Sequence, residues 1–573
     1  MSNYLMQLAT DGYKLGHGSM YRRGTQRVGS NLTPRTDKIH RRNCTAFYDG
    51  KLVWVGGQAA IQELNESWHR TFFTQPKGVV LKEYAEFLLD YLGRELPTVD
   101  QMAALHDLGY LPLEFRSLPE GSLVPMGIPV FTVTNTLDDF FWLVNYHETP
   151  LSASTWKTAT NATIAREYRK ICEYYTKLTG CYDAFAVSVM CHDFSMRGMS
   201  GIEDAARSGI GHLTQFIGTD TLPAIPFAKR YYDATGLIGI SVPATEHAVT
   251  SNNILSIEAE LSDGTYFADS KRGDSFDIWI KMKSNNEDNR LIAEVMFVYD
   301  LITRIVPNGI VSNVSDTYDF WGMLTRGYPY LKEVIMGREG FGPQPGKLVV
   351  RPDSGDPVKV ICGYEIAEEV VAAGQRLIET EVYATKLDGK YYLLGYHPEI
   401  EWVDGQELSE AEVKGAIAVL YETFGGTVTS TGHKLLDSHI GLIYGDSITT
   451  KRAEEILRRL AENGYAAANV VFGVGSYTYQ CNTRDTFGFA VKATNSVING
   501  EEVAIYKDPK TDSKKKSAKG RLFVFQNEDG NLELVDNVIA SVEAAPANML
   551  EVIFRDGEFV KRVTLDEIRT RSV

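Results

Sequence analysis

Short apolar runs that end in clusters of polar residues recur through the middle of the chain. Six such runs are evident: AFAVSVM before CHDFSMRG, IGISVP before ATEH, IVSNV before SDTYD, KLVV before RPDSGDP, IGLIY before GDS, and NVVF before GVGS. Parallel strands that are buried on both faces read as continuous apolar runs, and in α/β barrels the chemistry lies in the loops at the C-terminal ends of the strands. The pattern therefore predicts an α/β barrel enzyme.

The same patterns divide the chain into two expected domains. Between about 160 and 495, strand-like runs alternate with helical stretches such as AEEILRRLAENGY. The first 159 residues mix helical patterns with strand-like pieces such as SLVPMGIPVFTVTNT, and the alternating strands after 495 are expected to rejoin them. We predict a discontinuous β-rich α+β domain of residues 1–159 and 496–573, and a barrel of residues 160–495 with a strand-rich insertion near 362–430.

Composition and charge narrow the range of partners. The 573 residues are 44% apolar and 11% aromatic, which supports a large core. The net charge is −16 and the pI is about 5.3, so the long-range field repels DNA and anionic membranes. A phosphate-bearing substrate would therefore need locally concentrated positive charge.

The cysteines and the start of the chain exclude other classes. Six cysteines form no CxxC pair, which argues against a zinc ribbon or a thioredoxin-like motif. The start, MSNYLMQLATDGYK, lacks a basic region followed by an apolar one, and no stretch approaches the roughly 18 apolar residues of a membrane helix. We expect a cytoplasmic location.

Two of the polar clusters carry residues suited to phosphate and magnesium. Arg351 and Asp353 follow the run KLVV, whereas Ser312 lies within the run IVSNV and Asp316 follows it. An arginine can hold phosphate oxygens at two points, and carboxylates hold hydrated Mg²⁺ or ribose hydroxyls. The alternatives are a surface turn with a local ion pair between Arg351 and Asp353, and helix N-capping by Ser315 or Asp316.

Small residues follow two further runs. Gly445 and Asp446 stand in YGDS, and Gly473 and Gly475 stand in FGVGS. Glycines let backbone N–H groups approach an anion, so these are candidates for a phosphate cradle, with ordinary strand-to-helix turns as the alternative. The motif GxxxxGK[ST] is absent from the sequence, which argues against a P-loop ATPase.

Other polar clusters suggest a planar ligand and a reactive histidine. Phe194 and Arg197 in HDFSMRG, with Asp220 in GTDT, would suit an aromatic ligand that forms hydrogen bonds, unless Phe194 is simply a core residue. His247 in SVPATEH could accept a phosphoryl group or hold a diphosphate, and its alternative is a structural role.

A basic run stands out in this acidic chain. It contains Lys507, Lys510, Lys514, Lys515, Lys516, Lys519 and Arg521, and Arg484 and Lys492 lie upstream of it. These residues would form a rim that faces a polyphosphate, or a solvated loop.

Taken in order, the motifs resemble nicotinamide phosphoribosyltransferases along almost the whole chain. They are DGYKLGH, HDFSMRG, GTDT, VPATEH, VSDTYD, RPDSGDP, GDS, FGVGSYTYQCNTRD and YKDP. The resemblance implies an irregular (β/α) barrel of the type II phosphoribosyltransferases with an additional β-rich α+β domain, and a homodimer with active sites shared between subunits. The implied reaction of NAD biosynthesis forms nicotinamide mononucleotide and diphosphate from nicotinamide and phosphoribosyl diphosphate.

The resemblance also implies roles for residues at the acceptor. Phe194 would stack on one face of the nicotinamide ring, and Tyr13 of the partner subunit would stack on the other. Asp220 would accept a hydrogen bond from the carboxamide NH₂, with Asp11 close by.

A second set of implied roles concerns the phosphates. Arg197 and Arg351 would contact the ribose phosphate region, Asp353 and Ser312 the ribose, and Asp316 the diphosphate. Asp316 and Asp353 would hold Mg²⁺, largely through diphosphate and water. His247 matches the histidine that ATP phosphorylates in this family. The remaining implied phosphate contacts are Gly445, Asp446 and Gly475 for the 5′-phosphate, and Arg484, Lys492, Lys507 and Lys515 for polyphosphate from the other subunit.

The chain differs from the family pattern at two places. Ser476–Tyr479 replaces a glycine run, and Ala490 replaces a serine, so we expect ATP binding to be affected more than the core transfer. The nearest alternative activity is nicotinate phosphoribosyltransferase, against which Asp220 argues because two carboxylates repel each other. A noncatalytic protein on the same fold is the alternative from another class.

Overall fold

The computed structural model describes residues 5–94, 96–341, 345–378, 381–397, 400–506 and 518–573. The chain forms two compact units, each built from segments that are far apart in the sequence. The first unit comprises Met1–Glu167, Ser195–Gly239 and Tyr479–Val573, and the second comprises Tyr168–Phe194 and Ile240–Thr478.

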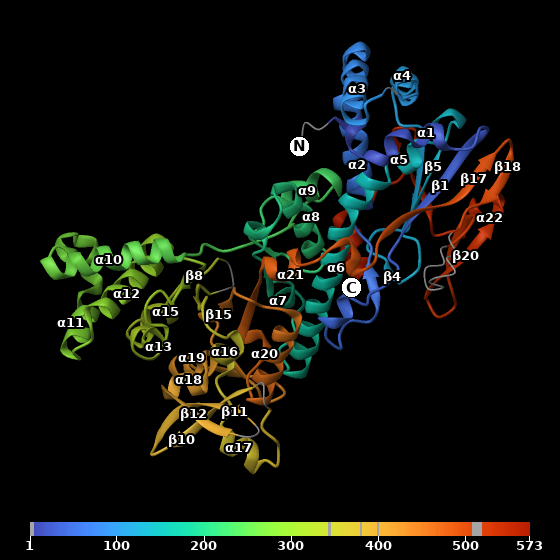
Figure 1. Cartoon of the computed structure of the whole chain (residues 1–573). Helices are drawn as coiled ribbons and strands as arrows, with labels where there is room; N and C mark the ends of the chain where they lie inside the picture. Colours follow the sequence, from blue (N-terminus) through green and yellow to red (C-terminus); the bar gives the residue numbers. More distant parts are fainter. Residues whose placement is uncertain (1–4, 95, 342–344, 379–380, 398–399, 507–517) are drawn as a thin grey trace. The chain divides into compact units, whose positions relative to one another are not determined.

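An antiparallel sheet forms the centre of the first unit. In the described part of the chain it has seven strands, in the order β18 (Glu501–Ala504), β17 (Ala490–Ile498), β1 (Thr25–Thr33), β5 (Phe131–Asn135), β3 (Leu113–Ser117), β21 (Glu551–Arg555) and β22 (Glu558–Phe559). β1 pairs with β17 and β3 pairs with β21, and Figure 1 shows the blue strand β1 beside the orange strand β17. The two ends of the chain therefore build one sheet.

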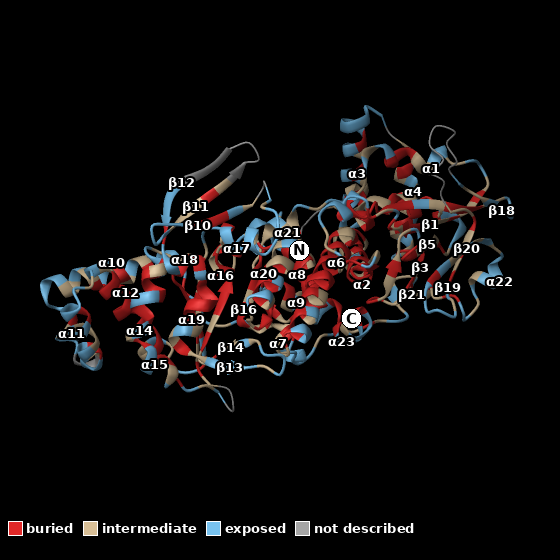
Figure 2. Cartoon of the chain, turned by 90° about the horizontal axis from the view of Figure 1, so that it is seen from below, coloured by how far each residue is buried: buried red, intermediate tan, exposed pale blue. Residues whose placement is uncertain are grey.

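One face of this sheet is buried, as the alternation of buried and partly exposed positions along its strands shows. On β5 the buried residues Phe131 and Val133 lie on either side of the partly exposed Thr132. Phe131 and Val133 belong to one hydrophobic cluster with Val28 and Leu32 of β1 and Phe115 of β3. Burying each such side chain contributes about 1.5–3 kcal/mol. Figure 2 shows the buried segments of this unit in red.

Helices and shorter strands complete the first unit. The helices are α1 (His17–Met20), α2 (Gly57–Trp68), α3 (Lys77–Leu92), α4 (Thr98–Leu108), α5 (Leu143–Tyr146), the first part of α6 (Glu148–Leu178), α8 (Ile202–Leu213), α9 (Ala224–Tyr231), α22 (Ala540–Glu543) and α23 (Leu565–Ser572). The shorter strands are β2 (Lys51–Val53), β4 (Leu123–Pro125), β7 (Gly218–Thr219), β19 (Arg521–Gln526) and β20 (Leu532–Val538).

A parallel sheet forms the centre of the second unit. Its strands lie in the order β6 (Cys191–Asp193), β16 (Val470–Val474), β15 (Ile440–Tyr444), β9 (Lys347–Arg351) and β8 (Ile310–Val314). Each of these strands is parallel to its neighbour. Helix α20 (Thr450–Glu462) connects β15 to β16, as a parallel pair requires. The predicted α/β class with a parallel sheet is confirmed.

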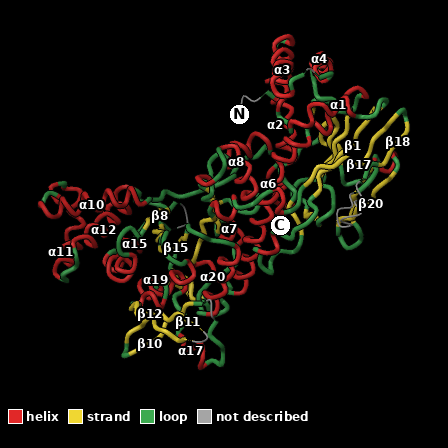
Figure 3. Tube along the Cα trace, viewed as in Figure 1, coloured by secondary structure: helices red, strands yellow, loops and turns green. Residues whose placement is uncertain are grey.

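The remaining helices of the second unit lie before or between these strands in the sequence, and Figure 3 draws them in red. They are α7 (Ala184–Ser188), α10 (His247–Asp263), α11 (Phe276–Ser284), α12 (Asn289–Asp300), α13 (Phe320–Gly322), α14 (Tyr328–Tyr330), α15 (Lys332–Met336), α16 (Pro357–Cys362), α17 (Ala367–Ala372), α18 (Glu410–Lys414) and α19 (Ala416–Phe424). Helix α21 (Ser476–Gln480) includes the boundary between the units.

The segment between residues 362 and 430 holds a separate antiparallel sheet. Its strands are β10 (Val382–Leu387), β11 (Lys390–His397) and β12 (Ile400–Leu408). A hairpin of β13 (Gly426–Val428) and β14 (Lys434–Leu436) follows. No helix in the described ranges is long and apolar enough to span a bilayer.

The expectation of a strand in AFAVSVM is wrong. Residues Ala184–Ser188 form helix α7, because the side chain of Asp183 caps it by accepting a hydrogen bond from the backbone N–H of Ala186 at 2.7 Å. The strand comprises Cys191–Asp193, which are the first residues of the predicted polar loop CHDFSMRG.

The strand expected in IGISVP is wrong as well. The segment forms no strand, and Ala244, the residue after it, forms an isolated parallel bridge with Ser312 of β8. Pro243, the last residue of the segment, accepts a hydrogen bond from the backbone N–H of Ser312 but has no N–H of its own to continue a ladder. The other four runs form β8, β9, β15 and β16 as predicted.

Candidate active site

The parallel register brings the polar clusters of the second unit to one edge of the sheet. Val314 of β8 lies beside Arg351 of β9, and Tyr444 of β15 lies beside Phe472 of β16. Because these strands run in the same direction, the residues that follow them emerge at the same edge. The clusters after β8, β9, β15 and β16 therefore surround one region.

The loops after β8 and β9 are joined through Asp316. Its Oδ2 accepts hydrogen bonds from the backbone N–H of Asp353 at 2.9 Å and from Oγ of Ser354 at 2.5 Å. The backbone N–H of Ser315 donates to the carbonyl of Arg351 at 2.9 Å. Asp316 has only 5% of its side chain exposed, so these hydrogen bonds lie largely out of water.

The structure does not support the alternative that Ser315 or Asp316 caps a helix. Asp319, rather than Ser315 or Asp316, caps the helix that follows, since its carboxylate accepts from the backbone N–H of Gly322 at 2.8 Å. Ser315 is buried and its hydroxyl lies 2.6 Å from the hydroxyl of Tyr328. Asp316 is thus left to hold the Asp353 turn.

Arg351 does not pair with a carboxylate in the described residues. One of its terminal nitrogens donates to the carbonyl of Thr245 at 2.8 Å, and its Nε is buried without a hydrogen-bond partner. The hydroxyl of Ser312 is likewise buried without a hydrogen-bond partner. Buried polar groups are normally satisfied, so these two donors fit a site that is completed by ligand oxygens.

His247 is the first residue of α10 and lies beside this group. Its Nδ1 is 3.2 Å from Oγ1 of Thr317, and its Nε2 is 3.7 Å from Oδ1 of Asp316. Half of the side chain is exposed, and no hydrogen-bond partner lies against this second oxygen of Asp316. The imidazole is therefore accessible and has a carboxylate to orient it.

Glu294 is an acid near this site that the sequence analysis missed. It lies on α12 and is almost fully buried, and its Oε1 has no hydrogen-bond partner. Burial, with smaller contributions from the charges of Asp319 and Asp316, raises the pKa of Glu294 to about 8. A single acid inside the apolar run LIAEVMFV was the available signal.

The glycines after β15 and on β16 accommodate the ring of Phe194. A Cβ on Gly473 would lie 2.4 Å from Cδ2 of Phe194 and 2.7 Å from Cα of Gly445, and a Cβ on Gly445 would lie 3.3 Å from the same ring. Gly475 has open space at this position. Close packing of Phe194 accounts for Gly473, whereas Gly475 stays free to approach a ligand. Asp446, the residue after Gly445, is exposed.

The remaining expected residues lie in the first unit. Asp220 is exposed directly after β7, Arg197 is exposed in a 3₁₀ turn, and Arg484 is exposed 3.4 Å from Asp485. Tyr13 is also exposed, and Lys492 of β17 lies 3.3 Å from Glu148. Lys507 and Lys515 lie outside the described residues.

One residue at each departure from the family pattern, Tyr479 and Ala490, is buried in the first unit. Tyr479 is buried, and its hydroxyl lies 2.8 Å from Nδ1 of His212. Ala490 is buried at the start of β17.

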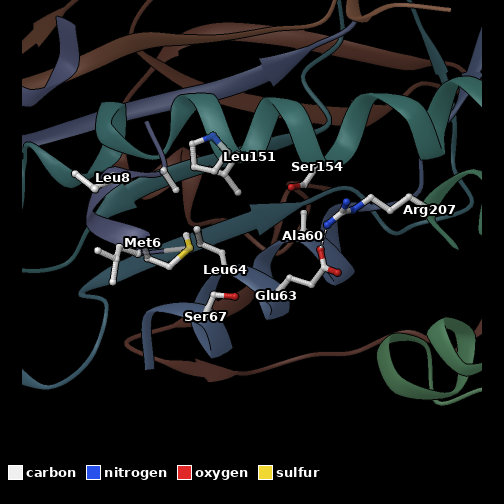
Figure 4. A pocket seen from close by; sticks show the side chains of 12 residues that line it. Met6, Leu8, Ala60, Glu63, Leu64, Ser67, Leu151, Ser154 and Arg207 are labelled. Atoms are coloured by element: carbon white, nitrogen blue, oxygen red, sulfur yellow. Dashed lines mark hydrogen bonds and ion pairs between the residues drawn. The ribbon is translucent and has the colours of Figure 1, made fainter. Parts of the chain in front are cut away.

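Among the cavities lined by described residues, two differ in their relation to the expected site residues. One of about 360 Å³ lies against the turn after β9 and is lined by residues that include Asp316, Ser354 and Gly355. The other, of about 600 Å³, lies in the first unit between α2 and the start of α6, and Figure 4 shows Arg207 pointing toward Glu63 inside it. None of the expected site residues lines this second cavity, which is mainly apolar.

The described residues contain no group of three or more histidine, cysteine or acidic side chains that could hold a metal ion. Asp316 and Asp353 are close through their shared turn, and Oδ1 of Asp316 lacks a hydrogen-bond partner. Mg²⁺ usually keeps several waters and uses one or two carboxylates together with substrate phosphates. This pair fits that mode of binding.

Comparisons with known proteins identify relatives along nearly the whole chain. A sequence model of the nicotinate phosphoribosyltransferase (NAPRTase) family matches residues 189–300 and 307–563. A nicotinamide phosphoribosyltransferase of Acinetobacter baylyi is 43% identical over 565 residues, which are 98% of this chain and 96% of that protein. One of Mycoplasma pneumoniae is 28% identical over 90% of this chain and 94% of that protein. The crystal structure of human nicotinic acid phosphoribosyltransferase shares the fold, with a TM-score of 0.50 and 15% identity, over 99% of this chain and 92% of that one.

Proposed function

The chain belongs to the nicotinate phosphoribosyltransferase family, and from this premise we propose that it is a nicotinamide phosphoribosyltransferase. The pentosyl transfer forms nicotinamide mononucleotide and diphosphate from nicotinamide and phosphoribosyl diphosphate. The observation that carries the proposal is near full-length similarity to proteins of that name. The joined loops of Asp316 and Asp353 supply a site of suitable chemistry.

In this reaction the bond between ribose C1 and the diphosphate loosens, positive charge grows on the ribose ring, and the pyridine nitrogen attacks C1 from the opposite face. The electron pair of the broken bond leaves with the diphosphate. Positioning and charge neutralisation therefore carry most of the catalysis. The unpartnered Nε of Arg351 and hydroxyl of Ser312 are donors suited to phosphate and ribose oxygens.

The acceptor is held by a second group of residues in our proposal. Phe194, whose ring packs over Gly473, would stack on nicotinamide, and Asp220 would accept from its carboxamide. Tyr13 of the partner subunit would cover the other face of the ring. This arrangement requires a homodimer.

Asp316 and Asp353 would hold Mg²⁺ together with diphosphate oxygens and water. The ion would supply charge neutralisation of the leaving group. The two carboxylates would orient this hydrated cation while Asp316 also keeps the turn after β9 in place.

A ring nitrogen of His247 would bond to the γ-phosphorus of ATP, and ADP would leave with the electron pair of the broken bond. The exposure of this histidine and the neighbouring Asp316 support this role, because a carboxylate beside the imidazole can fix the orientation of the ring. Phosphate contacts from Gly445, Asp446, Gly475, Arg197, Arg484, Lys492, Lys507 and Lys515 complete the proposal. We also propose a cytoplasmic location.

Turnover by the purified protein tests the function. The protein is incubated with phosphoribosyl diphosphate and Mg²⁺, and with nicotinamide or nicotinate, each with and without ATP. We expect product from nicotinamide and a higher yield with ATP. Product from nicotinate alone would instead identify the second candidate, which the family's name favours and the acidic side chain of Asp220 opposes. No product from either base would favour a noncatalytic role.

A further inference from the structure

The start of helix α6 holds both ends of the short turn that contains Tyr13. Oε2 of Glu148 accepts from Nζ of Lys14 at 2.8 Å, and Oγ1 of Thr149 donates to Oδ2 of Asp11 at 2.6 Å. Glu148 and Thr149 are the first two residues of the helix, where a carboxylate is also favoured by the helix dipole. Asp11 and Lys14 are therefore anchored to one rigid element.

Tyr13 lies between these two anchors and points away from the unit's core. Its side chain is 66% exposed, whereas Lys14 beside it is only 3% exposed. Nζ of Lys14 lies 5.3 Å from the centre of the Tyr13 ring. A buried lysine in an ion pair thus fixes the base from which an exposed aromatic ring projects, and this lowers the entropy lost when the ring meets a ligand.

A third contact limits the movement of the turn. Tyr91 of α3 lies over Gly12 so closely that a Cβ on Gly12 would be 2.4 Å from its hydroxyl oxygen. The turn is therefore supported from α3 as well as from α6.

The other oxygen of Glu148 reaches a different element. Oε1 lies 3.3 Å from Nζ of Lys492 on β17, so one carboxylate contacts two lysines from distant parts of the sequence. Glu148 is itself 24% exposed, and Lys492 is about half exposed, which leaves the Lys492 ammonium group accessible to an anion. One side chain therefore connects the Tyr13 turn to a cation that is available for phosphate.

We propose that Glu148 is a positioning residue that couples two substrate subsites. Through Lys14 it holds the turn that presents Tyr13 to the nicotinamide ring, and through Lys492 it aims an ammonium group at the phosphates. This inference rests on the proposed function, from which it takes the ligands of Tyr13 and Lys492. It adds that the two subsites share one carboxylate and weaken together when it is lost.

The variant Glu148→Gln tests this coupling. Loss of a charge-assisted ion pair is expected to raise the KM for nicotinamide and the KM for phosphoribosyl diphosphate each by about tenfold. Lys14→Met should raise the first KM only, and Lys492→Met should raise the second only. A rise in only one KM with Glu148→Gln, or in neither, would overturn the coupling.

Glu173→Gln is the matched control. Glu173 lies on the same helix, is 20% exposed, and also contacts two cations, Arg169 at 2.7 Å and Lys177 at 3.6 Å. A merely structural effect would lower the melting temperature of both variants and leave both KM values within about twofold of the wild type.

Hydrogen exchange gives a readout that does not depend on turnover. The backbone N–H of Lys14 donates to the carbonyl of Asp11 at 2.9 Å, so its exchange reports on the turn. We expect Glu148→Gln to speed exchange of a peptide spanning residues 11–16 by about tenfold, and Glu173→Gln to leave it unchanged. Unchanged exchange in Glu148→Gln would overturn the anchoring role even in a protein that fails to use nicotinamide. Absent turnover in the wild type with faster exchange in the variant would count against the proposed function alone.

Discussion

Asp316 accepts a hydrogen bond from the backbone N–H of Asp353, so the loops after two neighbouring strands share one carboxylate. The same carboxylate lies 3.7 Å from Nε2 of His247 through its other oxygen. Three motifs that are separate in the sequence, VPATEH, VSDTYD and RPDSGDP, therefore meet at one side chain. Changes at this point are expected to affect the whole site.

Replacement of Asp316 by asparagine should impair phosphoribosyl diphosphate binding. The amide keeps the volume but loses the charge that strengthens the hydrogen bonds from Asp353 and Ser354 and that would hold the proposed Mg²⁺, so we expect kcat/KM to fall by about 10- to 100-fold. Steady-state kinetics with phosphoribosyl diphosphate as the varied substrate measure this. Asp319→Asn is the control, because asparagine still caps a helix. Equal losses in the two variants would contradict the role of Asp316.

Asp220→Ala should weaken nicotinamide binding selectively. In our proposal the variant lacks the acceptor for the carboxamide NH₂, so we expect the KM for nicotinamide to rise by about tenfold or more with a small change in the KM for phosphoribosyl diphosphate. The exposed Asp277 on α11 provides the control variant Asp277→Ala. If the KM for nicotinamide is the same in wild type and Asp220→Ala, Asp220 does not bind this substrate.

Gly473→Ala should displace the ring of Phe194. The new methyl group would lie 2.4 Å from that ring and 2.7 Å from the backbone of Gly445, so the ring has to move. We expect the KM for nicotinamide to rise by about tenfold, because the stacking surface is lost. In the control Gly441→Ala on β15 the nearest atom, Cδ of Lys347, is 3.4 Å from the Cβ, an ordinary contact. A normal KM in Gly473→Ala would show that Phe194 does not position the acceptor.

His147 should make the folded protein sensitive to acid. Burial lowers its pKa from 6.5 to about 4, so the ring stays neutral in the folded state while the unfolded chain takes up a proton. The neutral His147 therefore contributes to the free energy of unfolding above pH 6.5. This contribution, on the order of 3 kcal/mol in total, is lost as the pH falls toward 4.

Urea unfolding of His147→Gln at several pH values checks this expectation. The variant lacks the titrating group, so its free energy of unfolding should fall less than that of the wild type as the pH falls from 6.5 toward 4. His69→Gln, which makes the same substitution at an exposed histidine, is the control. A constant difference between His147→Gln and the wild type across this range would exclude His147 as the source.

The sequence by itself determined the local structure and the chemistry of the motifs. The runs before SDTYD, RPDSGDP, GDS and GVGS are strands, because uninterrupted apolar residues between polar turns suit a sheet that is covered on both faces. The pattern failed at the other two runs: Asp183 caps a helix in AFAVS, and IGISVP forms no strand. The order of the motifs was enough to indicate the family.

The tertiary structure decided which of these residues meet. Asp316 and Asp319 look equivalent in SDTYD, and only the register of β8 against β9 directs the first to Asp353 and leaves the second to cap a helix. Likewise, no local pattern joins Lys14, Glu148 and Lys492. Their contacts depend on strand register and on the packing of distant segments, whereas propensity and periodicity report only on neighbours along the chain.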